Sequence, residues 1–270
     1  MNKSQDTQTK DKHTKQKAQE TIIAMFDKIA KDYDKTNRIL SLGIDVSWRK
    51  DAVKKAYKAR NTRDIGRIVD VACGSGDMIK HWHSYALESN IVVREIIGID
   101  PSQEMLKIAQ NKLQAIDESS AKTDSKISLH LGEAKDLSTL ESQSVDILSI
   151  SYGLRNVLEY EQALHEFARV LKPEGIVVVL DFFKKSSPSL LDRIIGIYTK
   201  HILPCIGYLI SRNYAAYKYL PDSMEEFITP NELALALEKV GIQPLEISSY
   251  SVGISHLVLG QKPCDKADKM

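Results

Sequence analysis

Nearly continuous runs of Ile, Val and Leu alternate along the chain with longer stretches in which apolar residues recur at helical spacing. Such runs indicate strands that are covered on both faces, as in a parallel sheet. We predict strands at residues 67–73, 95–100, 127–133, 145–151 and 175–182. Because helical stretches separate these strands, the pattern predicts an α/β fold with a doubly wound, mainly parallel sheet.

The pattern changes near the C-terminal end. Residues 229–232 (Thr-Pro-Asn-Glu) form a capping-box sequence with proline at the first helical position, and Gly241 follows the last apolar turn. Strands predicted at residues 244–250 and 254–262 are joined by a short Ser-Val-Gly link, so they should pair as an antiparallel hairpin. A mainly parallel sheet that ends in such a hairpin is typical of class I methyltransferases and less typical of dinucleotide-dependent oxidoreductases.

Two helical segments lie outside this alternation. Residues 21–60 carry apolar side chains at helical spacing before any strand, and residues 186–227 interrupt the pattern after the fifth strand. We predict that they form an N-terminal lid and a substrate-binding insertion of one domain, residues 21–263. Residues 1–20 are rich in Lys, Gln, Thr and Asp, which predicts a disordered tail, and residues 264–270 form a second tail.

Composition and charge exclude few functions. Lys and Arg number 37 against 36 Asp and Glu, so the net charge of +1 gives no argument for a nucleic-acid partner. Three widely separated cysteines indicate neither a metal site nor a disulfide framework, and favour a reducing, cytoplasmic compartment. Residues 190–210 are apolar, but charged residues in their middle argue against a spanning helix. A helix at the inner membrane surface, or one that covers an apolar pocket, is left open.

A glycine-rich turn at residues 70–77 is the strongest local motif. Gly74 and Gly76 lack a Cβ, so a ligand can approach the backbone N–H groups that open the next helix. A dinucleotide site would need a third glycine where Ile79 stands, and the carboxylate of Asp77 would repel a pyrophosphate. A cofactor with cationic sulfonium and ammonium groups tolerates that carboxylate, so the turn favours S-adenosylmethionine.

Residues at the next strand ends extend this cofactor site. Asp100 ends the second strand and is expected to accept hydrogen bonds from both ribose hydroxyls; the alternative is that it only caps the following helix. Asp70 either orients the glycine turn or approaches the ammonium group of the cofactor. Glu133 and Ala134, after the third strand, are expected beside the adenine; the alternative is a solvated turn.

Residues 151–156 follow the central fourth strand, where ligands bind in doubly wound sheets. An arginine and an asparagine directly after an apolar strand are unusual as core residues. We therefore expect Arg155 and Asn156 at the reaction centre, with a surface ion pair as the alternative for Arg155.

These motifs resemble the ubiquinone/menaquinone biosynthesis C-methyltransferases over residues 25–262. The resemblance rests on blocks at residues 25–49, 151–157 and 203–223. Departures include Ser75, where the family usually has Thr, and residues 181–185, which differ from its usual strand-end sequence. The resemblance implies cofactor contacts by Ser75, Asp100, Glu133, Ala134 and Ser151, and it places Arg155 and Asn156 at the substrate. It also implies methylation of a ring carbon of demethylmenaquinol, or of the related benzoquinol in ubiquinone synthesis.

The chemistry on the substrate side is a hypothesis. A quinol ring carbon becomes a good nucleophile when the neighbouring hydroxyl loses its proton. Arg155 stays protonated, so it would stabilise the phenolate or hold the water that takes the proton, and Asn156 would orient either. Candidate acid–base groups are Tyr33, Asp34, His201 and His256. The predicted substrate residues are Tyr33, Asp34, Asn37, Tyr152, His201 and Tyr217.

Three other functions remain open: a methyltransferase for a different small molecule, a nicotinamide-dependent oxidoreductase, and a non-catalytic protein that binds a prenylquinol in a biosynthetic assembly. The proposed chemistry requires no metal, and the sequence shows no ligand cluster for one. The expected partners are S-adenosylmethionine and a prenylated quinol. A peripheral membrane contact and a homo-oligomer are left open, and no nucleic acid is expected.

Overall fold

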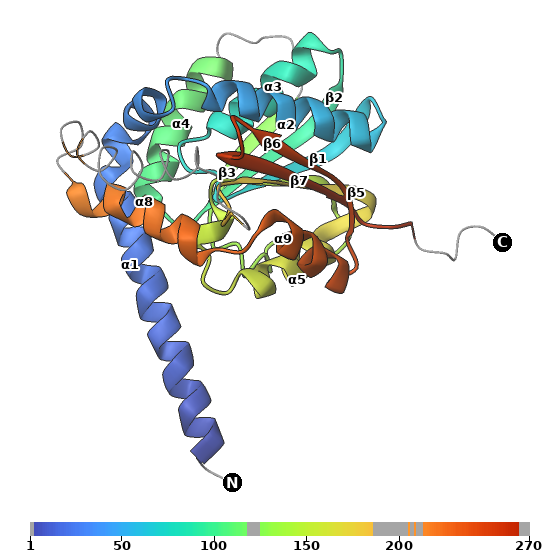
Figure 1. Cartoon of the computed structure of the whole chain (residues 1–270). Coiled ribbons are helices and arrows are strands. Elements are labelled where there is room, and N and C mark those ends of the chain that lie inside the picture. Colours follow the sequence, from blue (N-terminus) through green and yellow to red (C-terminus); the bar gives the residue numbers. More distant parts are fainter. Residues whose placement is uncertain (1–2, 118–124, 186–204, 206–207, 209–212, 265–270) are drawn as a thin grey trace.

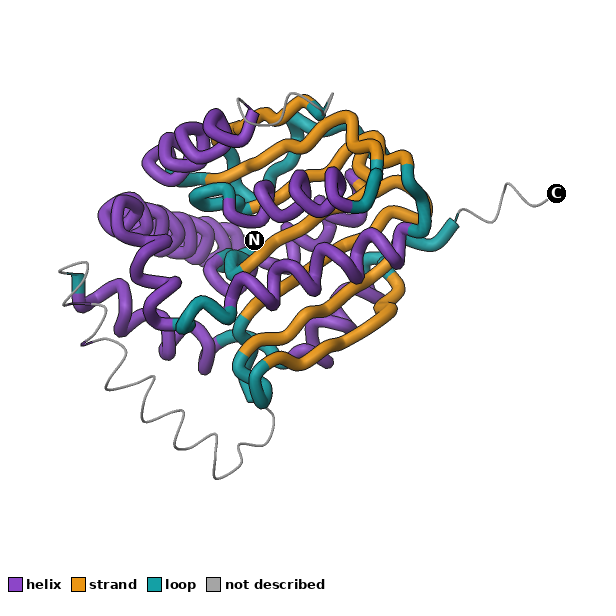
Figure 2. The backbone as a smooth tube through the Cα atoms, turned by 90° about the horizontal axis from the view of Figure 1, so that it is seen from above, coloured by secondary structure: helices purple, strands orange, loops and turns teal. Residues whose placement is uncertain are grey.

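In the computed structural model, which describes residues 3–117, 125–185, 205, 208 and 213–264, a single sheet forms the centre of the molecule and helices cover both of its faces (Figures 1 and 2). The strands are β1 Asp64–Val71, β2 Val92–Asp100, β3 Lys126–Leu131, β4 Val145–Ser151, β5 Leu171–Asp181, β6 Gln243–Tyr250 and β7 Ser255–Gln261. The helices are α1 Lys3–Leu40, α2 Asp45–Arg60, α3 Asp77–Glu88, α4 Gln103–Asp117, η1 Leu154–Asn156, α5 Tyr160–Val170, α8 Tyr214–Glu226 and α9 Pro230–Lys239.

The strand order is β3-β2-β1-β4-β5-β7-β6. β1 is parallel to both of its neighbours, β2 and β4, and the pairs β2–β3 and β4–β5 are parallel as well. β7 pairs antiparallel with β5 and with β6. Each strand overlaps its predicted range, and the predicted doubly wound sheet with a terminal antiparallel hairpin, the class I methyltransferase topology, is confirmed.

Burial on both faces explains the continuous apolar runs in the strands. Val69 of β1 belongs to the core on the face that α5 and α9 cover, together with Phe167 of α5. Its neighbour Ile68 belongs to the core on the opposite face, together with Trp82 of α3, and α2 packs on this side too. Successive residues of a strand point to opposite faces, so a strand between two helical layers must be apolar at nearly every position.

Helix α1 is longer than predicted. It begins at Lys3, so most of the segment expected as a disordered tail is helical. Lys, Gln and Ala are favourable in helices, and once a helix is nucleated downstream each added residue costs little. The N-terminal part of α1 projects from the body of the molecule (Figure 1), and α1 contacts α4 and α8.

Helix α8 is the part of the predicted insertion at residues 186–227 that the structure describes in full, and it lies beside α1 (Figure 1). The side-chain oxygen of Asn213 caps its start by accepting a hydrogen bond from the backbone N–H of Ala216. His201 and the predicted membrane-surface helix lie outside the described residues. None of the described helices combines the length and the apolar character that crossing a bilayer requires.

Candidate active site

The glycine-rich turn between β1 and α3 has an unusual backbone. Ala72, Gly74 and Gly76 have φ angles of 51°, 54° and 82°, in the left-handed region that favours glycine. A Cβ built on Gly74 would meet no atom within 4 Å, so a side chain there would project into open space. The backbone N–H of Gly74 donates a hydrogen bond of 2.8 Å to Oδ2 of Asp100, which ties the turn to the end of β2.

Asp100 is fixed at both carboxylate oxygens. Oδ2 accepts from Gly74, and Oδ1 accepts from the backbone N–H of Ser102 at 2.8 Å. Ser102, rather than Asp100, caps α4, because its Oγ accepts from the backbone N–H of Met105. Burial raises the pKa of Asp100 to about 6, although the two backbone hydrogen bonds favour the ionised form. Ser102 therefore has the capping role that was the alternative for Asp100, and Asp100 instead lines a cavity.

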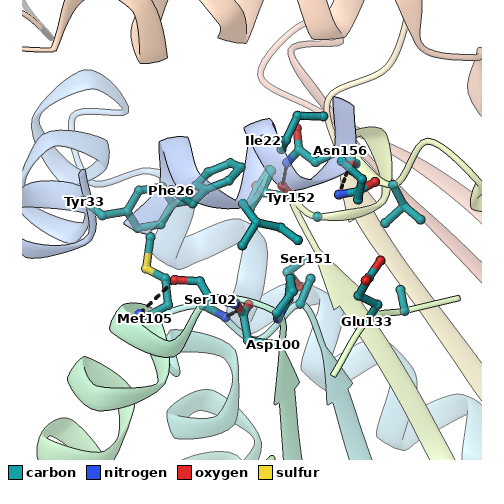
Figure 3. Close-up of a pocket in the computed structure, with 18 residues that line it drawn as sticks. Ile22, Phe26, Tyr33, Asp100, Ser102, Met105, Glu133, Ser151, Tyr152 and Asn156 are labelled. Carbon is teal, nitrogen blue, oxygen red and sulfur yellow. Dashed lines mark hydrogen bonds between the residues drawn. The ribbon is translucent and has the colours of Figure 1, made fainter. Parts of the chain in front are cut away.

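That cavity, which is partly open to solvent, has an empty volume of about 690 Å³ between α1 and the carboxyl ends of the strands. Figure 3 shows Ile22, Phe26 and Tyr33 of α1 on one side, with Asp100 and Ser151 facing them from the strand ends. The predicted cofactor residues Gly74, Asp100, Glu133, Ala134 and Ser151 all line it, as do Tyr33, Tyr152 and Asn156 from the predicted substrate side. We call it the larger cavity.

A second, smaller cavity of about 450 Å³ adjoins the first, and both are lined by Tyr33, Ala72, Gly74 and Ser151. Its wall also includes the predicted residues Asp34, Asn37, Asp70 and Ser75. Arg49 of α2, which was not among the predicted site residues, lines this cavity as well. The two cavities thus bring together all predicted cofactor residues except Gly76, which holds the turn itself.

Three buried polar oxygens in these walls have no hydrogen-bond partner within the described part of the chain. They are Oδ2 of Asp70, Oγ of Ser151 and Oδ1 of Asn156. Oδ1 of Asp70 accepts from Ser149 Oγ at 2.6 Å, and burial raises the pKa of Asp70 to about 7. Because an unsatisfied buried acceptor costs free energy, three of them in the walls of two adjoining cavities indicate a polar ligand.

The turn after β4 is as tightly built as the glycine turn. Tyr152 has a φ of 59°, its N–H donates to the carbonyl of Leu180 at 2.6 Å, and its carbonyl accepts from Nη1 of Arg155 at 2.7 Å. A Cβ on Gly153 would lie 2.6 Å from Cβ of Ala72, so only glycine lets the two turns approach this closely. The left-handed backbone conformation of Tyr152 forms the turn whose residues Ser151 and Asn156 line the larger cavity.

Arg155 occupies a different place from the one predicted. Its guanidinium forms an ion pair with Asp181 at the end of β5, and it lines neither cavity. The pair is buried, so it differs also from the surface ion pair that was the alternative. A direct contact of Arg155 with substrate stays a prediction.

An ion-pair cluster holds α1 against the glycine turn. Asp34 of α1 accepts from Oγ of Ser75 and from Nζ of Lys112, the latter at 2.7 Å, and Lys112 also lies 2.6 Å from Asp77. Arg38 of α1 lies 3.3 Å from the same Asp77. We call these five residues the α1 clasp. Lys112 comes from the far end of α4 and no local motif marks it, so sequence reasoning missed it.

The remaining predicted residues lie elsewhere. Tyr217 of α8 is buried in a small core with Ile29 of α1, outside both cavities. His256 of β7 is half-buried, and its ring centre lies 5.9 Å from that of Phe183. Conversely, Gln19 lies in the segment predicted as a tail, yet its side chain binds the backbone of Asn156 and of Leu158 at 3.0 Å each. In the described ranges, no group of three His, Cys, Asp or Glu side chains is placed to hold a metal ion.

Comparison with known proteins shows to which family this chain belongs. The chain matches the sequence model of the ubiE/COQ5 methyltransferase family over residues 12–262. It belongs to that family. A ubiquinone/menaquinone biosynthesis C-methyltransferase of Campylobacter jejuni is 45% identical over 244 residues, which cover 90% of this chain and 98% of the relative. One of Geotalea daltonii is 38% identical over 245 residues, covering 90% and 97%.

Solved structures show the same fold at low sequence identity. An S-adenosylmethionine-dependent methyltransferase of Thermotoga maritima aligns with a TM-score of 0.57 at 20% identity, covering 89% of this chain and 99% of that one. The cyclase SpnF aligns with a TM-score of 0.55 at 17% identity, covering 80% and 82%. A cyclase and a methyltransferase therefore share this fold, and family membership, rather than fold alone, makes this ubiE/COQ5-family chain a methyltransferase.

Proposed function

We propose that this protein transfers the methyl group of S-adenosylmethionine to a ring carbon of a prenylated quinol, with demethylmenaquinol or the benzoquinol of ubiquinone synthesis as acceptor. One observation carries the proposal: the unpaired oxygens of Asp70, Ser151 and Asn156 belong to the walls of two adjoining cavities, the larger of which has an apolar wall formed by α1. The names of the Campylobacter and Geotalea relatives support the same class of acceptor.

The residues present fit S-adenosylmethionine. The open side of Gly74 and the buried, partnerless Oδ2 of Asp70 suit a cofactor that carries an ammonium group. Asp100, held by two backbone N–H groups, keeps lone pairs for the ribose hydroxyls, and Glu133 and Ala134 line the larger cavity where adenine would bind. When bound, this cofactor supplies an electrophilic methyl group on its sulfonium.

The acceptor side is predominantly apolar. Ile22, Ile23 and Phe26 of α1 line the larger cavity and suit a quinol ring with its prenyl chain. Oδ1 of Asn156 is free to accept a hydrogen bond from a ring hydroxyl, because the amide nitrogen is already directed at the carbonyl of Tyr152, 3.3 Å away. Asn156 thus orients the ring while α1 excludes water from the reacting carbon.

Arg155 supports the site indirectly, by fixing the position of the turn after β4. Its guanidinium holds the carbonyl of Tyr152 and thereby the turn that presents Ser151 and Asn156. The positive charge also acts on Tyr33, which lines both cavities, and opposes the rise in the pKa of that phenol that burial causes.

We further propose a peripheral contact with the cytoplasmic surface of a membrane, from which a prenylated substrate would be drawn. Ile39, Leu42 and Ile44 are exposed at the turn between α1 and α2, and Leu42 is 92% exposed. Exposed apolar side chains that cluster in one turn support an interfacial contact. Flotation with liposomes, compared between the chain and its Leu42→Ser variant, tests this contact.

Transfer of label from methyl-labelled S-adenosylmethionine to separate demethylmenaquinol and benzoquinol acceptors tests the main proposal. We expect label on a ring carbon of at least one acceptor. Binding of the quinol without transfer would favour the non-catalytic alternative. No affinity for S-adenosylmethionine or its demethylated product, together with tight binding of a nicotinamide dinucleotide, would overturn the proposal.

A further inference from the structure

Arg49 of α2 is a buried cation with unused hydrogen-bond donors. Its side chain is 10% exposed, and Nη1 is directed at Asp45, with Oδ2 at 2.5 Å. The guanidinium carbon lies 4.8 Å from the centre of the Tyr152 ring. Within the described ranges, Nη2 and Nε make no hydrogen bond, although an arginine has five N–H donors.

The surroundings of Arg49 are strongly acidic. The smaller cavity is lined by four aspartates, and Arg49 is the one Lys, Arg or His among the described residues of its wall. Three of the aspartates are already paired: Asp34 and Asp77 with Lys112, and Asp45 with Arg38 and Arg49. Asp70 is the exception, with Oδ2 left over.

One small space therefore holds a cation with free donors and a carboxylate with a free acceptor. The positive charge of Arg49 also opposes the rise in the pKa of Asp70 that burial causes. A ligand that satisfies both must carry a positive donor and a negative acceptor a short distance apart. An α-amino acid group has this chemistry.

We propose that Arg49 binds the carboxylate of the methionine part of S-adenosylmethionine, while Oδ2 of Asp70 accepts from its ammonium group. The inference rests on the proposed function and adds to the cofactor site a residue to which the sequence motifs assign no role. A planar guanidinium with free N–H donors on both Nη2 and Nε suits a carboxylate better than an ammonium would. The rival explanation is structural: Arg49 would only hold Asp45 and the ring of Tyr152.

Two ligands separate these explanations without any turnover. S-adenosylhomocysteine carries the amino-acid group, whereas 5′-methylthioadenosine has the same adenosine and sulfur without it. We expect calorimetry to show that Arg49→Gln lowers the affinity for S-adenosylhomocysteine by about 10- to 100-fold, the loss typical of a charge-assisted hydrogen bond. The affinity for 5′-methylthioadenosine should stay nearly unchanged. Arg49→Lys should recover part of the loss, because a point charge remains.

Arg38→Gln is the matched control. Arg38 is paired with the same Asp45, at 2.7 Å, but does not line the smaller cavity. We expect this variant to keep the wild-type ratio of the two affinities. Equal losses for both ligands in Arg49→Gln, or no loss for either, would overturn the inference.

A measurement on the unmodified protein guards against a variant that fails to fold. The analogue of S-adenosylhomocysteine with a carboxamide in place of the carboxylate should bind the wild-type chain about 10-fold or more weakly. Equal affinity for S-adenosylhomocysteine and its carboxamide analogue would overturn the proposed role of Arg49 but not the proposed function. Failure of the wild type to bind S-adenosylhomocysteine at all would overturn the proposed function and this inference with it.

Discussion

Arg155 and Asp181 form an ion pair in the interior, with Nη1 of Arg155 2.5 Å from Oδ1 of Asp181 and side chains that are 6% and 0% exposed. The backbone N–H of Phe182 donates to the same carboxylate oxygen. Since Arg155 also holds the carbonyl of Tyr152, the pair joins the end of β5 to the turn after β4. This turn carries the polar groups that face the larger cavity.

Arg155→Leu should lower the free energy of unfolding by about 3–5 kcal/mol, because it leaves the charge of Asp181 buried without a partner. Urea unfolding measures the change. The control is Arg94→Leu, which removes an ion pair with Asp64 whose side chains are 64% and 57% exposed and should cost about 0–1 kcal/mol. Unchanged stability with a loss of turnover alone would instead place Arg155 on the substrate, as the sequence predicts.

The pKa of Asp70 leads to a pH dependence of cofactor binding. Burial raises this pKa from 3.8 to about 7, so the carboxyl group binds a proton more tightly in the folded chain than in the unfolded one. Its contribution to stability therefore falls as pH rises from about 4 to about 7. A bound ammonium group favours the ionised form, so affinity should change in the opposite sense.

Calorimetry with S-adenosylhomocysteine tests this expectation. Affinity should rise by up to about 10-fold between about pH 6 and about pH 8, as Asp70 ionises. In Asp70→Asn most of the rise should disappear, which leaves the weaker dependence that comes from Asp100. With 5′-methylthioadenosine only the weaker dependence that comes from Asp100, whose pKa is about 6, should remain. A rise of the same size in Asp70→Asn would assign it to another group.

Asn156→Ala should affect the acceptor and spare the cofactor. It removes the free Oδ1 in the larger cavity, so we expect kcat/KM for the quinol to fall by about 10- to 100-fold. Affinity for S-adenosylhomocysteine, measured in parallel, should stay at the wild-type value. A parallel loss of that affinity would move Asn156 to the cofactor side of the site.

Gly153→Ala should destabilise the chain by about 1–3 kcal/mol, because the new Cβ would lie 2.6 Å from that of Ala72 and force the two turns apart. The double variant Ala72→Gly/Gly153→Ala should recover most of the loss. Ala72→Gly alone should be neutral or slightly stabilising, since φ at this position is 51°. Thermal unfolding of the four proteins measures the cycle, and strict additivity would show that the two residues do not interact.

Gln19→Ala should loosen α1 at the larger cavity. Oε1 of Gln19 accepts from the backbone N–H of Leu158, so hydrogen exchange at this amide should become faster in the variant. The control is Gln16→Ala on the same helix, where the side chain is exposed and is directed at Glu20. Equal exchange at Leu158 in all three proteins would show that the contact does not hold α1 in solution.

The strands and the cofactor side of the site could be predicted from the sequence because they depend on local patterns. Continuous apolar runs mark strands that are buried on both faces, and the carboxyl ends of parallel strands share one edge. Residues that follow different strands, such as Asp100 and Ser151, must therefore meet, whatever the details of the connections.

The rest depends on contacts between distant segments. Lys112 and Arg49 reach the site from the sides of helices, where a cation is ordinary on any exposed surface. No motif includes Lys112, and the block that ends at Arg49 gives that residue no role. Arg155 follows the expected strand, but the partner that directs its side chain, Asp181, is 26 residues away in the chain. The polar composition of residues 1–20 does not show that Gln19 will find backbone partners after β4.

The wall shared by the two cavities has a thermodynamic consequence. Tyr33, Ala72, Gly74 and Ser151 line both spaces, so an occupant of one alters the surface offered to an occupant of the other. Linkage then requires reciprocity: the factor by which the bound methyl donor raises the affinity for the acceptor must equal the factor by which the bound acceptor raises the affinity for the donor. Because loss of the methyl group turns the cationic sulfonium into a neutral thioether, the coupling between spent donor and product is expected to differ from that between donor and acceptor.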